Sequence, residues 1–90
     1  MDIDAVHIVV CGRVQGVCYR NSARVRALEL KLVGWVRNCP DGTVEIHAQG
    51  DRKNLDKFIE WCGKGPPAAD VTGLDAVPVA RAGMETFLIR

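Results

Sequence analysis

The sequence predicts an α+β fold in which two helices cover one face of an antiparallel sheet. Three observations predict it. Short segments rich in β-branched residues alternate with two segments of helical apolar spacing, turn residues lie between them, and one strand candidate alternates strictly between apolar and polar residues. The elements follow in the order strand, helix, strand, strand, helix, strand, with a further strand candidate at the C-terminal end.

The first strand and the first helix are predicted near the N-terminus. Residues 5–11 are short, apolar and β-branched, and they end before a glycine, which is typical of a buried strand. In residues 21–31, Ala23, Ala27 and Leu30 recur at i, i+4 and i+7 while charged residues fall on the other side. This spacing indicates an amphipathic helix.

Two strands and a tight turn are predicted in the middle of the chain. Residues 33–38 form the second strand, and the CPDG stretch, residues 39–42, has the composition of a turn. Residues 43–49 alternate between apolar and polar side chains, as expected for a sheet with one covered face and one open face. His47 falls on the polar side, so we expect it on the open face without a catalytic role.

A second helix is predicted after Asp51, whose side chain can cap it. Leu55, Phe58 and Cys62 fall on one face of this segment, and Gly63 ends it. Because the apolar face is continuous, we expect the helix to pack on the sheet.

The C-terminal part of the chain is predicted to be extended. Residues 71–80 indicate a strand in which Pro78 suits an edge position, and residues 86–90 indicate a short fifth strand. The whole order of elements is that of the split β-α-β, or ferredoxin-like, sandwich, in which both helices cover one face. A chain of 90 residues can bury one core, so we expect a single domain over residues 1–90.

The composition limits the functions to consider. Twelve basic side chains against eleven acidic ones leave a formal net charge of +1, which offers no general attraction to nucleic acid or to an anionic membrane. The longest apolar run is far shorter than the roughly 20 residues of a membrane helix, and no basic-then-apolar leader begins the chain. We therefore expect a soluble cytoplasmic monomer that binds neither nucleic acid nor membrane.

Four cysteines are spread singly along the chain, without the C-x-x-C spacing of zinc or redox sites. They are Cys11, Cys18, Cys39 and Cys62. Neither a metal site nor a cofactor domain is therefore indicated. Because no leader begins the chain, we expect reduced thiols, with Cys11 and Cys62 packed as small hydrophobic residues.

The stretch GRVQGVCYRNSAR, residues 12–24, is the most informative part of the sequence. A glycine-flanked loop between a strand and a helix gathers unpaired backbone N–H groups beside the positive end of the helix dipole. Gly16 can adopt positive φ, which lets the amides of residues 15–20 curl around one tetrahedral oxyanion. Arg20 can add a bidentate contact to two phosphate oxygens. On spacing alone, the loop is either such an anion site or a plain connection.

Two motifs resemble those of a known family. GRVQGVCYR, residues 12–20, resembles the signature of acylphosphatases, and GWVRNCPDGTVEIHAQG, residues 34–50, is similar to their second motif. The resemblance runs from residue 6 to residue 90, with Tyr19 at a position where the family usually has phenylalanine. It implies hydrolysis of a carboxyl-phosphate mixed anhydride to a carboxylate and inorganic phosphate, without a metal, a cofactor or a covalent intermediate.

The resemblance also implies roles for two side chains and for one run of backbone amides. Arg20 binds the phosphate, and Asn38 orients the attacking water. The amide cradle comprises Gln15, Gly16, Val17, Cys18, Tyr19 and Arg20. An asparagine suits the water because its amide offers an acceptor and donors without bringing negative charge near the phosphate. The partners implied are an acyl phosphate as substrate, and inorganic phosphate or other tetrahedral anions as product or inhibitor.

Two other interpretations of the chain stay open at this point. Residues 18–24, CYRNSAR, satisfy the C-x5-R pattern of cysteine-dependent phosphatases, with Cys18 as nucleophile and Arg24 on the phosphate. Against it, Arg24 falls within the helical pattern and no Asp-Pro pair supplies an acid. The other interpretation is a non-catalytic ferredoxin-like module that binds an anion or RNA, although residues 43–49 lack aromatic side chains that could stack bases.

Overall fold

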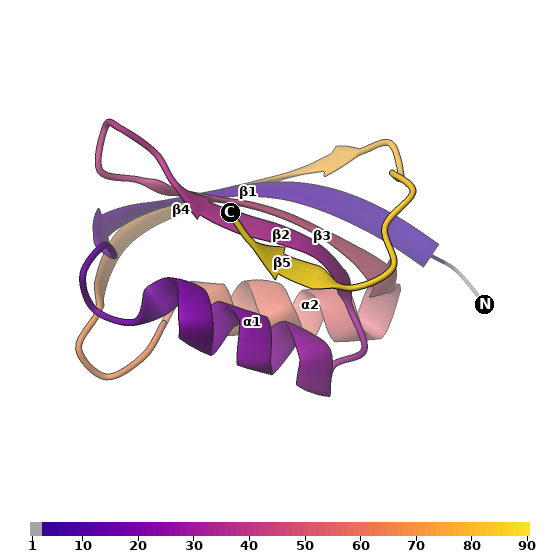
Figure 1. The fold of residues 1–90 in the computed structure, drawn as a ribbon, viewed down its shortest axis with the longest axis horizontal. Helices are drawn as coiled ribbons and strands as arrows, with labels where there is room; N and C mark the ends of the chain where they lie inside the picture. Colours follow the sequence, from indigo (N-terminus) through magenta and orange to yellow (C-terminus); the bar gives the residue numbers. More distant parts are fainter. Residues whose placement is uncertain (1–2) are drawn as a thin grey trace.

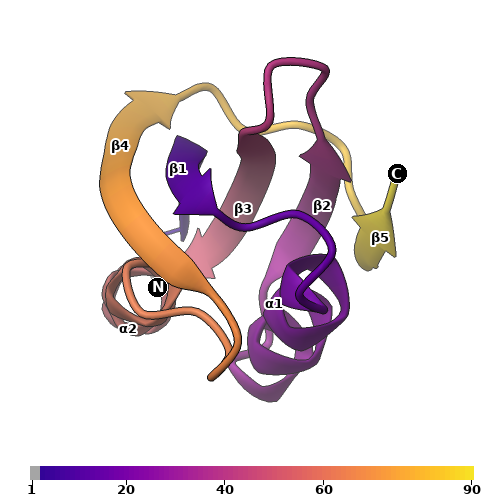
Figure 2. The same ribbon diagram turned by 90° about the vertical axis from the view of Figure 1, so that its left-hand side faces the viewer.

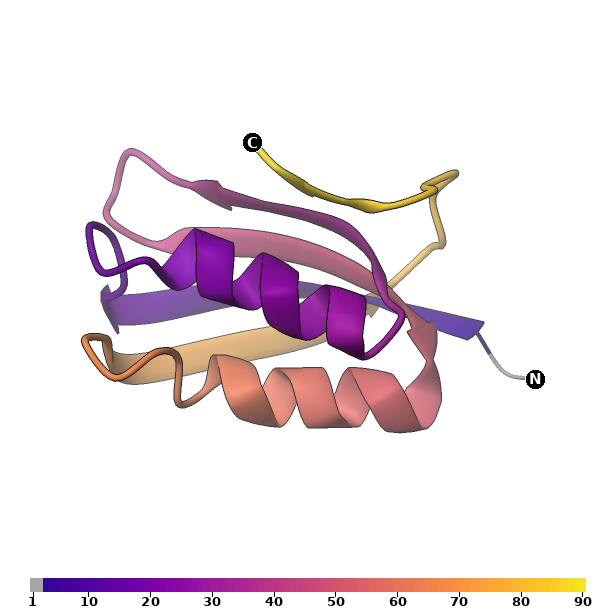
Figure 3. The ribbon, with the colours of Figure 1, turned by 60° about the horizontal axis from the view of Figure 1, so that its bottom comes forward.

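A computed structural model describes residues 3–90 of the chain. It has two layers, a twisted sheet and two helices that lie side by side on one of its faces, as Figure 1 and Figure 3 show. The strands are β1 (Ile3–Arg13), β2 (Val33–Asn38), β3 (Val44–Asp51), β4 (Asp70–Val79) and β5 (Phe87–Ile89). The helices are α1 (Tyr19–Glu29) and α2 (Arg52–Cys62).

The strand order in the sheet is β4-β1-β3-β2-β5, which can be followed in the end view of Figure 2. Neighbouring strands are antiparallel except β5, which pairs in parallel with β2 at the edge of the sheet. The predicted α+β ferredoxin-like fold is therefore confirmed, with the fifth strand added beside β2. This order puts the C-terminal ends of β2 and β5 near the start of α1.

The second helix and the last long strand agree with the prediction. Asp51 caps α2, because its Oδ2 accepts a hydrogen bond from the backbone N–H of Lys53 at 3.1 Å. β4 is an edge strand, and Pro78 lies within it, where a missing N–H is tolerated.

β1 continues past the glycine that was predicted to stop it. A bulge between Cys11 and Gly12 shifts its register against β4, and the strand runs on to Arg13. Gly12 has φ 119°, and a Cβ at this position would lie 2.2 Å from the backbone oxygen of Asp70. The glycine therefore allows close strand pairing here rather than ending the strand.

Helix α1 begins at Tyr19, two residues before the predicted start, and ends at Glu29, two residues before the predicted end. Cys18 turns the chain into the helix with a left-handed conformation, φ 63°, and its side chain makes no capping hydrogen bond. Lys31 turns the chain out with φ 58°. Neither residue type marks a helix end in sequence, since asparagine and glycine are the usual left-handed residues.

The core lies between the sheet and the two helices. Val44, Ile46 and Ala48 of β3 face it and are fully buried, which confirms the predicted alternation of this strand. The largest fully buried side chains are Tyr19, Phe58, Phe87, Ile8, Leu32, Ile46 and Leu55. They come from both helices and from three strands, as well as from the segment before β2, so one core holds all the elements together.

Two cysteines predicted to be packed differ in burial. Cys62 is fully buried at the end of α2, and burial raises the pKa of its thiol to about 12. Cys11, in contrast, is exposed, so its predicted packing in the core is wrong. The reason is the alternation of β1, in which Val10 faces the core and Cys11 therefore faces the opposite side of the sheet.

His47 lies on the face of the sheet away from the helices, as predicted, but it is buried rather than open to water, with 8% of its surface exposed. Its ring stacks on Trp35 at a centroid distance of 6.3 Å, and its Nε2 lies 2.9 Å from Oε1 of Gln49. Gln49 in turn holds the backbone of Ala82 through two hydrogen bonds. The segment between β4 and β5 thus covers part of a face that the alternation alone predicts to be wet.

We expect Gly34→Ala to destabilise the fold strongly. Gly34 has φ 148°, and a Cβ there would lie 1.8 Å from the backbone oxygen of His47 on β3. Since backbone atoms must then move apart, the free energy of unfolding should fall by at least about 3 kcal/mol. Gly83→Ala is the control, because nothing lies within 4 Å of a Cβ at that position. Denaturant unfolding of both variants checks this, and an equal effect in the two would contradict it.

Candidate active site

A small cavity of about 120 Å³ lies where the β1–α1 loop, the start of α1 and the ends of β2 and β5 meet. It is lined by Val14, Gly16, Cys18, Tyr19, Arg20, Asn21, Asn38 and Ile89. The fold thus brings Arg20 and Asn38 to one cavity, although they lie in different elements. Three lining residues were not predicted at the site, namely Val14, Asn21 and Ile89, and Ile89 reaches it through the pairing of β5 with β2. Gln15 and Val17, which were predicted in the amide cradle, are not among the lining residues.

The loop of residues 14–18 leaves its backbone donors available. Gly16 has φ 74° and Cys18 has φ 63°, and these two left-handed residues curve the chain. Among the hydrogen bonds formed within residues 3–90, none has a backbone N–H of this loop as its donor. The first turn of α1 adds N–H groups that have no partner inside the helix. It contains no acidic residue that would oppose an anion.

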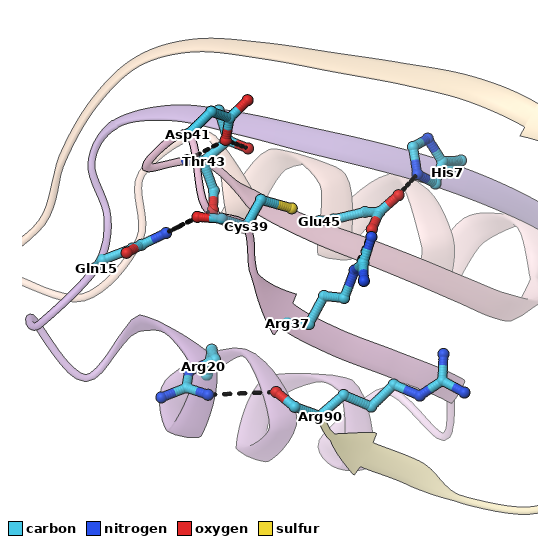
Figure 4. A network of polar contacts seen from close by, with 9 residues as sticks. All are labelled: His7, Gln15, Arg20, Arg37, Cys39, Asp41, Thr43, Glu45 and Arg90. Atoms are coloured by element: carbon cyan, nitrogen blue, oxygen red, sulfur yellow. Dashed lines mark hydrogen bonds and ion pairs between the residues drawn. The ribbon is translucent and has the colours of Figure 1, made fainter.

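Arg20 lies in the first turn of α1, half-buried, at the edge of the cavity. Its Nη1 donates a hydrogen bond of 3.3 Å to the main-chain oxygen of Arg90, as Figure 4 shows. Arg90 is itself held in place, because its backbone N–H donates to Val36 at 2.8 Å and its guanidinium lies 5.0 Å from the centre of the Trp35 ring. The C-terminal segment therefore holds one side of the Arg20 guanidinium.

Asn38 is the last residue of β2 and lines the same cavity. Its Oδ1 is buried and has no hydrogen-bond partner among residues 3–90. A buried polar atom without a partner costs about 1–3 kcal/mol, so such atoms are rare in native proteins unless a ligand or a water completes them. Asn38 thus offers the cavity an unused acceptor.

The turn after Asn38 is tied to the loop by a side chain. Nε2 of Gln15 donates hydrogen bonds to the backbone oxygens of Cys39, at 2.8 Å, and Thr43, at 2.9 Å. Inside the turn, Oδ1 of Asp41 accepts from the hydroxyl and the backbone N–H of Thr43, and these bonds lower the pKa of Asp41. The sequence pointed to Gln15 only for its backbone amide, and no local pattern marks the partners of its side chain.

Arg37 directly precedes Asn38 in the chain, but its guanidinium forms an ion pair with Glu45, which does not line the cavity. Glu45 accepts hydrogen bonds from Nε2 of His7, at 2.6 Å, and from Nε of Arg37, and these contacts lower its pKa (Figure 4). Arg37 therefore does not share the cavity with Asn38, although the two are neighbours in the chain.

Arg24 does not meet Cys18. Its Nε donates to the backbone oxygen of Phe87 at 2.9 Å, and it is not among the residues that line the cavity. In a cysteine-dependent phosphatase this arginine would hold the phosphate beside the nucleophilic thiol. The C-x5-R pattern is therefore not assembled into a site here.

Within residues 3–90, no group of three or more His, Cys, Asp or Glu side chains is placed to hold a metal ion. In the same part of the chain, no helix has both the length and the apolar character needed to cross a membrane.

The chain is similar to one protein family along nearly its whole length. The model of the acylphosphatase family matches residues 6–89, which is nearly the whole chain. The chain belongs to the acylphosphatase family. The acylphosphatase of Methylococcus capsulatus is 56% identical over 87% of this chain and 85% of its own length.

Solved acylphosphatase structures agree with this assignment. The acylphosphatase of Coxiella burnetii superposes with a TM-score of 0.96 at 37% identity and covers 99% of this chain and 94% of its own. That of Bacillus subtilis gives 0.94 at 38% identity, with 97% and 98% covered. The predicted fold and the predicted enzyme class, an acylphosphatase, are confirmed, and an acyl phosphate is the implied substrate.

The side chain of Tyr19 links the start of α1 to the end of α2. Its hydroxyl donates to the backbone oxygen of Cys62 at 2.7 Å in the core, and burial raises its pKa, so it stays protonated as a donor. Tyr19→Phe removes this bond and leaves a buried oxygen without its donor. We expect the free energy of unfolding to fall by about 1–2 kcal/mol, measured by denaturant unfolding. An unchanged value would contradict the contact.

Proposed function

We propose that residues 1–90 form one catalytic domain that hydrolyses the carboxyl-phosphate bond of acyl phosphates without a metal ion or a covalent intermediate. Arg20 and the backbone amides of residues 15–20 bind the phosphoryl group, and Asn38 orients the attacking water. The observation that carries the proposal is the unpartnered, buried Oδ1 of Asn38 in the same cavity as Arg20. The cytoplasmic location and the monomeric state stay predictions.

Phosphate binding follows from the donors around the loop. Phosphoryl transfer spreads negative charge over three equatorial oxygens, and it requires mainly positioning and fixed positive potential. The unpaired amides and the helix dipole supply that potential without reorganisation. Arg20 supplies a planar fork of donors, and its long contact of 3.3 Å to Arg90 leaves other guanidinium N–H groups for phosphate oxygens. Inorganic phosphate, as product, is expected to occupy the same donors.

Hydrolysis requires a water in line with the bond that breaks. The water oxygen attacks phosphorus, the bond from phosphorus to the acyl oxygen breaks, and the carboxylate leaves with the electron pair. The water proton passes to a phosphate oxygen. A carboxylate leaving group has a low pKa and needs no strong acid, which agrees with the absence of Asp, Glu and His from the described residues that line the cavity. Oδ1 of Asn38 accepts a hydrogen bond from the water and so fixes its direction.

Replacing Arg20 tests the phosphate site and the activity together. We expect Arg20→Ala to abolish turnover of a synthetic acyl phosphate and binding of inorganic phosphate, and Arg20→Lys to fail to restore either, because an ammonium group cannot reproduce the planar fork. The assay measures release of carboxylate and phosphate from benzoyl phosphate in excess chelator, with an aryl phosphate monoester as the comparison substrate.

Arg24→Lys is the matched control, since Arg24 lies one turn along the same helix and outside the cavity. It should keep wild-type turnover. Loss of activity in Arg24→Lys with retention in Arg20→Lys would restore the cysteine-phosphatase interpretation, and turnover only with a metal ion present would contradict the metal-free mechanism.

Replacing Asn38 separates water orientation from phosphate binding. We expect Asn38→Ala to lower kcat by at least about 10²-fold, comparable to the loss of one preorganised polar contact, while the Kd of inorganic phosphate stays nearly unchanged. Single-turnover kinetics and calorimetric phosphate titration measure the two effects. A collapse of phosphate affinity in this variant would mean that Asn38 supports the loop rather than the water.

A further inference from the structure

The side chain of Gln15 joins the two halves of the proposed site and has no part in the mechanism above. It donates from the loop to the backbone oxygens of Cys39 and Thr43, which follow Asn38 in the turn between β2 and β3, as Figure 4 shows for Cys39. Within residues 3–90, no other side chain of the loop 14–18 forms a hydrogen bond. This contact is therefore the polar connection between the loop and the turn.

The two partners of Gln15 require an amide. Both are carbonyl oxygens, and the NH₂ group of glutamine has one hydrogen for each of them. This requirement also assigns the orientation of the amide, since an oxygen in the place of Nε2 would face two acceptors. A glutamate would meet the same repulsion, and an asparagine is one methylene shorter. The contact is thus specific to the chemistry and length of this side chain.

The contact reaches Asn38 through the backbone of the turn. The N–H of Cys39 donates to Thr43 at 2.9 Å, and the N–H of Gly42 donates to Cys39 at 3.1 Å. The side chain of Gln15 donates to these same two backbone oxygens, of Cys39 and Thr43, from the neighbouring loop. Because Cys39 directly follows Asn38, holding its peptide group fixes the backbone from which the Asn38 side chain projects.

We propose that Gln15 is a positioning residue that sets the distance between the phosphate cradle and Asn38. This inference rests on the proposed function of those two parts. The cradle keeps its own anchors without Gln15, since Val14 and Val17 are 1% and 7% exposed in the core. Loss of the contact therefore separates the two parts rather than unfolding either. A misplacement of about 1 Å between reacting groups can lower a rate by about 10²-fold.

The test is a double-mutant cycle on Gln15→Ala and Asn38→Ala. In the wild-type background, Gln15→Ala should lower kcat by about tenfold or more, while the Kd of inorganic phosphate changes by less than about threefold. In the Asn38→Ala background, the same substitution should lower kcat by less than about twofold, because no oriented water remains to be misplaced. A purely structural role would lower kcat by the same factor in both backgrounds.

Gln49→Ala is the matched control. Gln49 also uses its amide to hold the main chain by two hydrogen bonds, to Ala82 at 2.7 and 2.9 Å, but it does not line the cavity. It should lower the free energy of unfolding as Gln15→Ala does and leave kcat and phosphate affinity as in wild type. A loss of kcat in Gln49→Ala equal to that in Gln15→Ala would overturn the positioning role.

Equal loss of phosphate affinity and of kcat in Gln15→Ala would assign Gln15 to the cradle alone and overturn the inference. If Gln15→Ala does not fold, Gln15→Asn takes its place in the same cycle, with the same expected coupling. An Asn38→Ala variant with wild-type kcat would show that the proposed role of Asn38 in orienting water is wrong. Failure of the Gln15 inference alone looks different: Asn38→Ala lowers kcat, but Gln15→Ala lowers it by the same factor in both backgrounds.

Discussion

Unpaired backbone N–H groups at the start of α1 are the constraint on which the proposed phosphate site depends. A serine, asparagine or aspartate at the helix start would satisfy one of them and stabilise the helix by about 1 kcal/mol. The chain instead has Cys18 there, in a left-handed conformation and without a side-chain cap. An aspartate would also bring negative charge to the place where phosphate is proposed to bind. The helix start therefore lacks the stabilisation of a side-chain cap, and its N–H groups stay available for the proposed phosphate.

The rest of the fold compensates for these unsatisfied groups. Tyr19 follows the uncapped residue directly, and its ring is buried while its hydroxyl reaches the end of α2. On the loop side, Val14 and Val17 insert into the core. On the opposite wall, Asn38 leaves a buried oxygen without a partner, and the turn that follows is held by Gln15. Core burial therefore stabilises a loop and a turn whose polar groups lack protein partners among residues 3–90, as the proposed binding of phosphate and water requires.

The sequence predicted those parts of the structure that depend on local chemistry. β2 ends where its turn residues begin, α2 begins at its capping aspartate, and β3 alternates as its residues do, so these elements were found with nearly the right bounds. The parts it missed depend on contacts distant in sequence. The bulge at Gly12 exists because of pairing with β4, the burial of His47 depends on the segment around Ala82, and β5 brings Ile89 to the cavity.

In the candidate site, too, local motifs predicted the residues, whereas contacts between distant parts of the chain could not be predicted. The two motifs led to Arg20 and Asn38, and the fold brings both to one cavity. What these motifs could not indicate was how the two are held relative to each other. The main-chain oxygen of Arg90 contacts Arg20, and the carbonyls of Cys39 and Thr43 receive Gln15, so both supports join residues far apart in the chain. A single sequence carries no periodic signal for contacts of this kind.

Phosphate binding by the backbone amides at the start of α1 can be tested directly by titrating ¹⁵N-labelled protein with inorganic phosphate and following the chemical shifts of the backbone amides. We expect the largest shifts on the amides of residues 15–20, and we expect them to follow one binding curve and to disappear in Arg20→Ala. Shifts centred elsewhere on the protein, or a binding curve that Arg20→Ala leaves unchanged, would contradict it.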